Sequence, residues 1–191
     1  MERCKWVTND QVYIDYHDSE WGIPVYDDQK LFEMLILEGA QAGLNWITIL
    51  KRREAYREAF DNFDVNKISL YTEEKLEQLM KNDKIIRNKK KIYSVVQNAK
   101  SFLNIVNDYG SFSSYLWSFV NGTPIINHWV YQSDVPTQSE LSIAISKDLK
   151  KKGFSFVGPT IIYSYLQAVG VINDHIVSCF CHPHYKEEKA N

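Results

Sequence analysis

Residues 31–46 read LFEMLILEGAQAGLNW, and this stretch decides the fold class. Four of its residues are spaced so that they form one stripe along a helix: Leu31, Leu35, Glu38 and Ala42. Three more lie beside that stripe: Phe32, Ile36 and Gly39. Asp27 or Asp28 could cap the start of this helix. We expect the region 30–60 to be helical, with a second helix from about residue 48 to residue 60.

Helical patterns continue along the rest of the chain. We expect helices at about 72–81, 85–103, 111–120, 137–151 and 159–169, and a last helix that starts near Asn173 and carries His175 and Cys179. The segment 127–136 is irregular, and strand signals are scarce. The sequence therefore predicts an all-α fold.

Length and composition are typical of a globular protein. The chain has 191 residues, of which 45% are hydrophobic and 24% are charged, and we expect one two-lobed domain over 1–191. It has no run of 18 apolar residues and no signal-peptide core, so we expect no membrane span and a cytoplasmic protein. The net charge of −2 does not favour nucleic-acid binding, and the basic clusters at 51–53, 84–91 and 147–152 are typical of solvated helix faces.

Three cysteines, an odd number, argue against a disulfide framework and favour metal binding. His175 and Cys179 are four residues apart, a spacing that puts both on one face of a helix. Cys4 and His17 could complete a Cys2His2 site for structural zinc. The alternative is a buried thiol and a hydrogen-bonded core histidine. The further potential ligands are Cys181, His182 and His184, and spacing alone leaves both interpretations open.

Aromatic residues crowd the first quarter of the chain: Trp6, Tyr13, Tyr16, Trp21 and Trp46. They could form a core of large rings, or a pocket that stacks on a flat ligand such as a base flipped out of DNA. A cationic ring would also gain cation–π attraction. Glu38 lies in an apolar stretch, where a carboxylate needs a partner or a function. Gly39 and Ala40 beside it would allow a close approach.

Residues 151–160 read KKGFSFVGPT and predict a glycine hairpin between two helices. Gly153 ends the first helix, and free backbone N–H groups from Gly158 to Thr160 could hold an anion. Such a layout is typical of a helix-hairpin-helix motif, which grips a DNA phosphate. An ordinary corner between two helices is the alternative.

Taken together, these motifs resemble the type I 3-methyladenine DNA glycosylases of the helix-hairpin-helix superfamily. The resemblance runs from residue 1 to about residue 182. It rests on YIDYHDSEWG at 13–22, LFEM at 31–34, EGAQAGLNW at 38–46, GFSFVG at 153–158 and VINDH at 171–175.

The resemblance implies a role for each matching residue. Those that match the zinc ligands are Cys4, His17, His175 and Cys179, for one structural zinc ion per chain, and Cys181, His182 and His184 then fall outside the site. Glu38 matches the carboxylate that hydrogen-bonds the methylated base, and it is the expected catalytic residue. The other expected base-binding residues are Trp6, Tyr13, Tyr16, Trp21 and Trp46. The expected DNA-binding residues are Leu44, at the tip that fills the gap in the base stack, with Gln41 nearby, and Gly153, Gly158 and Thr160 at the hairpin that contacts a phosphate.

The implied activity is monofunctional excision of 3-methyladenine from double-stranded DNA, which leaves an abasic site, by a protein that we expect to be a monomer. Asn173 stands where many superfamily members have a catalytic aspartate, and Val157 precedes Gly158 where a Schiff-base lysine would be needed. Both agree with monofunctional chemistry. The alternatives are a zinc-stabilised DNA-binding module without catalysis and a zinc hydrolase, which four protein ligands would exclude because they leave no position for water.

Overall fold

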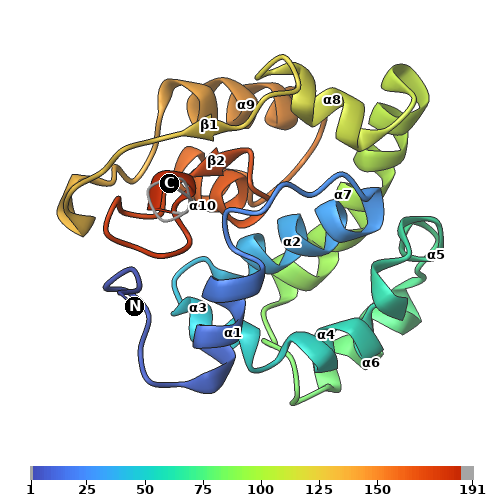
Figure 1. Cartoon of the computed structure of the whole chain (residues 1–191). Helices are drawn as coiled ribbons and strands as arrows, with labels where there is room; N and C mark the ends of the chain where they lie inside the picture. The colour runs from blue at the N-terminus through green and yellow to red at the C-terminus, as the bar shows by residue number, and fades with distance from the viewer. Residues whose placement is uncertain (1, 186–191) are drawn as a thin grey trace.

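The computed structural model describes residues 2–185 and is mainly helical, with α2 near its centre (Figure 1). The helices are α1 (Gln11–Ser19), α2 (Asp28–Gln41), α3 (Trp46–Leu50), α4 (Arg53–Ala59), α5 (Val65–Ser69), α6 (Glu73–Lys81), α7 (Lys89–Tyr109), α8 (Phe112–Ser118), α9 (Glu140–Lys151) and α10 (Pro159–Ala168). Two 3-10 turns, η1 (Asp61–Phe63) and η2 (Gln132–Asp134), and two short strands, β1 (Ile125–Ile126) and β2 (Ile172–Asn173), complete the described elements.

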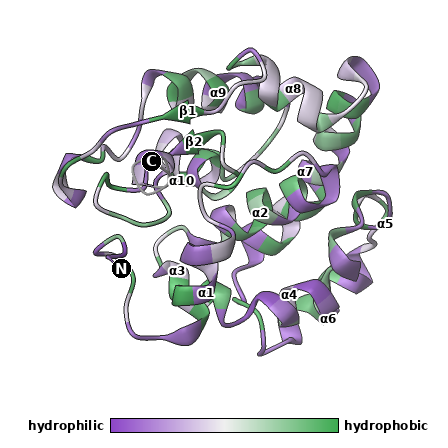
Figure 2. Ribbon diagram, in the orientation of Figure 1, coloured by the Kyte–Doolittle hydropathy of each residue, from purple (hydrophilic) through white to green (hydrophobic). Residues whose placement is uncertain are grey.

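Helix α2 is the central element that the sequence predicts. The Asp27 side chain accepts a hydrogen bond from the backbone N–H of Lys30 at 2.8 Å and caps the helix. Residues 31–40 are all buried, against α7, α8 and α10 among others. Asp28, the other candidate cap, instead accepts hydrogen bonds from the N–H groups of Phe112 and Ser113 at the start of α8. Green lies along α2 and α7 in Figure 2, whereas the outlying α4 and α6 are largely purple.

Two predicted helices have other bounds. The expected helix over 48–60 is two helices, α3 and α4, because the chain turns at Lys51–Arg52. The Arg52 guanidinium donates to the carbonyls of Asp83 and Lys84, at 3.0 and 2.8 Å, which holds this turn against a distant loop. The helix expected over 85–103 begins at Lys89, where the Asn88 side chain caps it, and continues to Tyr109.

The prediction of a helix that starts near Asn173 is wrong. Ile172 and Asn173 form β2, which pairs in parallel with β1 in the register Ile125 to Ile172. The backbone N–H groups of Ile125 and Asn127 donate to the carbonyls of Val171 and Asn173 at 2.9 and 3.0 Å. These bonds to a distant segment replace the local bonds of a helix. Helices α1 and α5 were not expected; Asp10 caps α1 and Asp64 caps α5.

The N-terminal segment runs beside the C-terminal one (Figure 1). The N–H groups of Gly22 and Val25 donate to the carbonyls of Gln167 and Val169, each at 3.0 Å. Gly170 permits this close approach, since a Cβ there would lie 2.2 Å from the carbonyl carbon of Ile23. Farther out, the Phe180 N–H donates to the Glu2 carbonyl at 3.1 Å. Within residues 2–185, no helix has the length and apolar character to cross a bilayer.

Candidate functional site

A cavity of about 310 Å³ lies between two parts of the chain, residues 6–46 and residues 132–167. Its walls are Trp6, Tyr13, Tyr16, Trp21, Glu38, Gln41, Trp46, Gln132, Val135, Pro136, Thr137, Thr160, Tyr163, Ser164 and Gln167. The structure thus brings together all six residues expected to bind a base, with Gln41 and Thr160 from the expected DNA-binding set. This volume suits a small flat ligand.

The aromatic rings of the cavity pack mainly edge to face. Trp6 lies 5.1 Å from both Tyr13 and Trp21, centroid to centroid, at steep angles. Tyr16 and Trp46 are 5.6 Å apart and tilted by 58°. At this angle a flat ligand can lie against one of these two rings but cannot be sandwiched between them, so stacking on both requires a ring to turn.

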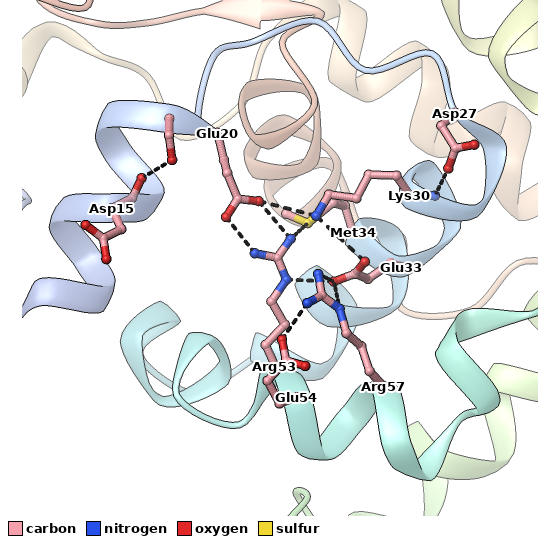
Figure 3. Close-up of polar contacts among 10 residues, drawn as sticks. Asp15, Glu20, Asp27, Lys30, Glu33, Met34, Arg53, Glu54 and Arg57 are labelled. Atoms are coloured by element: carbon pink, nitrogen blue, oxygen red, sulfur yellow. Dashed lines mark hydrogen bonds and ion pairs between the residues drawn. The ribbon is translucent and has the colours of Figure 1, made fainter.

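Helix α2 carries two buried carboxylates, and only one of them has a cationic partner. Figure 3 shows that Glu33 meets Arg53 and Arg57 from α4, with N–O distances of 2.6 and 2.8 Å. Arg53 also forms a two-pronged ion pair with Glu20, at 2.9 Å for each bond. Glu38 is 3% exposed, and no ion pair or side-chain hydrogen bond to it is formed by the residues that the structure describes. A buried carboxylate without a partner is costly, which makes Glu38 a candidate functional group.

The surroundings of Glu38 keep a proton on it. Burial raises the pKa of Glu38 to about 8 from its ordinary value of 4.5. Burial, together with the nearby Glu38 charge, also raises the pKa of Tyr13 and, by more, that of Tyr16. The cavity wall therefore holds a largely neutral carboxyl group at neutral pH, and a cation that enters the cavity would favour the carboxylate.

Three polar atoms on the cavity wall are buried without a hydrogen-bond partner. They are two indole donors, Nε1 of Trp6 and Nε1 of Trp46, and one acceptor, Oε1 of Gln132. Buried polar atoms in folded proteins are nearly always satisfied, so three exceptions on one cavity wall make this cavity a candidate site for a polar ligand.

The turn after α2 presents Leu44 at the surface beside the cavity. The Leu44 N–H donates to the Gln41 carbonyl at 2.7 Å, and the Gln41 side chain returns a 2.8 Å bond to the Leu44 carbonyl. Gly43 has a φ of +79°, which glycine adopts freely. The Leu44 side chain is left 38% exposed. Lys91, which sequence reasoning missed, donates to the Ala40 and Ala42 carbonyls at 2.8 and 2.6 Å and holds the turn in place.

Residues 152–158 join α9 to α10, and these two helices contact each other. Gly153 has a φ of +92°, and a Cβ there would lie 3.0 Å from the Ser101 hydroxyl. Gly158 precedes Pro159 at the start of α10, where no side chain caps the helix. Gly39 allows the hairpin to approach α2, since a Cβ at Gly39 would lie 3.2 Å from the Cβ of Phe156. Thr160, on the first turn of α10, is exposed at the cavity rim.

Four predicted metal ligands form one buried cluster: Cys4, His17, His175 and Cys179, whose ligand atoms all lie within 4.8 Å of one another. The Sγ of Cys179 is 3.5 Å from Nε2 of His17 and from Nδ1 of His175, and the Sγ of Cys4 is 3.6 Å from Nδ1 of His175. A tetrahedral zinc site, with bonds of about 2.3 Å to sulfur and about 2.0 Å to nitrogen, puts sulfur and nitrogen about 3.5 Å apart. The cluster could hold a metal ion of this size.

Each histidine in the cluster is also oriented by a hydrogen bond on its other nitrogen. His17 Nδ1 is 2.7 Å from an Asp18 carboxylate oxygen, and His175 Nε2 is 3.0 Å from the Trp21 carbonyl. These partners leave Nε2 of His17 and Nδ1 of His175 on the side of the cysteines, each 3.5 Å from the Sγ of Cys179, where they could bind a metal. A hydrogen bond from Arg3 holds the pKa of Asp18 below its ordinary range.

Turns, and not a helix, bring His175 and Cys179 together, because the chain leaves β2 and turns back towards Glu2. Of the alternative ligands, His182 bonds the Asn127 carbonyl and the N–H of His184. Cys181 lies close enough to His17 and Asp18 to form a second possible group, which shares His17 with the four-residue cluster.

Sequence reasoning missed several walls of the cavity, chiefly Gln132 and the polar face of α10. One signal was available: Thr160, Ser164 and Gln167 recur at helical spacing on an otherwise apolar helix, which indicates that this face meets a polar cavity. For Gln132 no such signal exists, because it lies in an irregular segment.

Comparison with known proteins points to one family and confirms the resemblance seen in the sequence. The family model for methyladenine glycosylases matches residues 6–182. DNA-3-methyladenine glycosylase 1 of Escherichia coli (strain K12) is 49% identical over 183 residues, 96% of this chain and 98% of that protein. A crystal structure of a 3-methyladenine DNA glycosylase I is 50% identical, with a TM-score of 0.93 over 95% of this chain and 100% of that one. A structure of the Staphylococcus aureus enzyme, described as the basis of its 3-methyladenine recognition, is 42% identical, with a TM-score of 0.93 over 96% of this chain and 97% of that one. The chain therefore belongs to the methyladenine glycosylase family and, as a glycosylase, is an enzyme.

Proposed function

We propose that this enzyme flips 3-methyladenine out of double-stranded DNA into the aromatic cavity and removes it by hydrolysis. The observation that carries the proposal is Glu38, a buried carboxyl group without a partner among aromatic rings. Such a group destabilises the free protein. A bound cationic ring would offset this cost, because it attracts the carboxylate and the faces of the aromatic rings. Relatives named for this substrate support the choice of base.

The reaction follows from the charge on the methylated base. Methylation at N3 makes the base of the nucleotide cationic. When the bond between C1′ and N9 breaks, its electron pair stays on N9, the base leaves neutral, and positive charge develops on the sugar. Water adds to C1′ and loses a proton, which leaves an abasic site. Since the leaving group already carries a charge, the protein needs to select the base more than to activate it.

Selection rests on Glu38 and the rings. A cation near Glu38 lowers the pKa of its carboxyl group from about 8, so the base enters as the proton leaves. Neutral adenine provides no such attraction. Trp46 and Tyr16 supply ring faces on which the base can lie, and a damaged base costs less to flip than an intact one.

Contacts with DNA come from two places beside the cavity. We assign Leu44, with Gln41, to the gap that the flipped base leaves in the stack, because the leucine is exposed at the tip of a braced turn. We assign the hairpin from Gly153 to Gly158, with Thr160, to a DNA phosphate, as a helix-hairpin-helix motif. The uncapped N–H groups at the start of α10 support this assignment.

We further propose that Cys4, His17, His175 and Cys179 hold one structural zinc ion. Its contribution would be to tie the two ends of the chain, since four protein ligands leave no position for a reacting water. The remaining parts of the proposal are a single two-lobed domain, with the cavity between residues 6–46 and 132–167, and a monomeric state.

The decisive experiment is to incubate the protein with methylated double-stranded DNA and to identify released bases by chromatography. We expect 3-methyladenine in the supernatant and abasic sites in the DNA, with neither product from unmethylated DNA. A DNA-binding module without catalysis would bind the duplex and release nothing, and that result would overturn the proposal.

A further inference from the structure

The segment between β1 and α9 forms the part of the cavity wall that carries Gln132. One buried carboxylate anchors it. Asp174 is fully buried and accepts hydrogen bonds from Asn127 Nδ2 and Trp129 Nε1, each at 2.7 Å. It also accepts bonds from Tyr163 and Gln167 on α10. One carboxylate therefore joins residues 127–129 to the helix that forms the other side of the wall.

The backbone around Gln132 is also held locally. Gln132 is the first residue of η2, in which the Asp134 N–H donates to the Tyr131 carbonyl at 3.0 Å and the Tyr131 N–H donates to an Asp134 carboxylate oxygen at 3.2 Å. With Asp174 holding 127–129 and this turn holding 131–134, the backbone that carries Gln132 is fixed at the cavity wall before any ligand binds. Such preorganisation reduces the entropy that binding must overcome.

The Gln132 side chain has no other task that the structure shows. Its Oε1 atom is buried at the cavity wall without a hydrogen-bond partner. A buried acceptor that has lost water and gained nothing destabilises the free protein. A ligand that donates a hydrogen bond would remove this cost.

We propose that Gln132 is a second determinant of base specificity, whose Oε1 accepts a hydrogen bond from the exocyclic amine of the bound purine. This inference rests on the proposed function of the cavity. In 3-methyladenine, N3 carries the methyl group and the only N–H bonds are the two of the exocyclic amine, in the free base and in the nucleotide alike. The acceptors on the cavity wall include the Glu38 carboxyl group and Gln132 Oε1, and Oε1 is the buried acceptor there without a hydrogen-bond partner among the described residues. A purine with a carbonyl in place of this amine would face Oε1 with a second acceptor.

Calorimetric titration with free 3-methyladenine and with 3-methylhypoxanthine, which has that carbonyl, tests the proposal. Gln132→Met keeps the length of the side chain and removes the acceptor. Gln132→Glu keeps both length and acceptor. Gln138→Met makes the same change at an exposed residue of the same segment, outside the cavity wall.

We expect Gln132→Met to bind 3-methyladenine about two- to tenfold more weakly, the worth of one hydrogen bond, and to bind 3-methylhypoxanthine no more weakly than the unaltered protein. Gln132→Glu should retain the preference for the amine, and Gln138→Met should match the unaltered protein.

If Gln132 only fills space, Gln132→Met should bind 3-methyladenine as tightly as the unaltered protein and Gln132→Glu should bind it more weakly. That result would overturn the inference. So would equal losses for both ligands in Gln132→Met. If the unaltered protein does not bind 3-methyladenine at all, the proposed function itself fails. Normal binding together with an unaffected Gln132→Met variant removes only the role of Gln132.

Discussion

Glu38→Gln provides the sharpest test of selection by charge, because it keeps the size of the side chain and removes its ability to ionise. With a pKa of about 8, ionising Glu38 at pH 7 costs about 1.4 kcal/mol. A cationic base at about 4 Å returns about 4 kcal/mol at an effective dielectric constant of about 20. The difference is about 2–3 kcal/mol, so we expect Glu38→Gln to lower kcat/KM on methylated DNA about 30- to 150-fold.

The same reasoning fixes the direction of the pH dependence. The pKa of Glu38 is raised, so below about pH 8 the charged form becomes costlier by about 1.4 kcal/mol for each pH unit. The advantage of the unaltered enzyme over Glu38→Gln should therefore shrink about tenfold per unit as pH falls from 8, and should be lost near pH 5.

The assay is single-turnover release of 3-methyladenine from methylated duplex DNA between pH 5.5 and 8.5. Glu77→Gln removes an exposed carboxylate on α6 and serves as the control. A ratio between the unaltered enzyme and Glu38→Gln that stays constant across this range would refute the charge argument. So would a Glu38→Gln variant as active as the unaltered enzyme at pH 8.

Glu38→Gln should raise the stability of the folded protein at neutral pH although it lowers activity. Because the folded-state pKa of Glu38 is raised from 4.5 to about 8, the folded protein holds a proton that the unfolded chain releases, and stability falls as pH rises through this window. At pH 7 the cost is of order 3 kcal/mol. We expect urea unfolding at pH 7 to show Glu38→Gln more stable than the unaltered protein, by much more than at pH 4.5. A less stable variant at pH 7 would indicate that Glu38 is a paired core residue.

Four further predictions concern the proposed zinc site, the leucine assigned to the DNA base stack, the hairpin assigned to a DNA phosphate, and the tryptophan assigned to stacking on the base. Metal analysis should find one zinc per chain, and Cys4→Ala or His175→Ala should lower thermal stability more than activity per folded molecule; native protein without zinc would contradict this. Leu44→Ala should reduce excision from duplex DNA more than calorimetric affinity for the free base, and equal losses would place Leu44 in the pocket or the core. Residue 158 has open space around it, so Gly158→Leu should weaken binding to all DNA sequences alike in filter assays, and the affinity of the unaltered protein should fall as salt rises; a folded variant with unchanged affinity would remove the hairpin from the interface. Trp46→Ala should weaken binding of 3-methyladenine by about 1–3 kcal/mol, the range for base stacking, unless the ring only packs the core, in which case stability alone would fall.

Local signals in the sequence were enough for most helices, because a helix is decided largely by periodicity and by its ends. The stripe from Leu31 predicted α2, and Asp27 caps it as expected. Thr72 and Ser111 likewise begin α6 and α8 through side-chain bonds to nearby N–H groups. The aromatic residues and the four Cys and His residues could be nominated from the sequence, since their chemistry is set by residue type.

The tertiary structure decided which of two similar carboxylates has cationic partners and which is left as the candidate functional group. Glu33 and Glu38 lie in the same apolar helix and look alike in sequence. Glu33 is matched by Arg53 and Arg57, which arrive from α4, whereas Glu38 faces a cavity whose far wall comes from residues 132–167. The strand at Ile172–Asn173, which replaced an expected helix, was likewise set by its pairing with β1. Periodicity reports the local preference of a segment, but the partner of a buried group is determined by which distant segments pack against it.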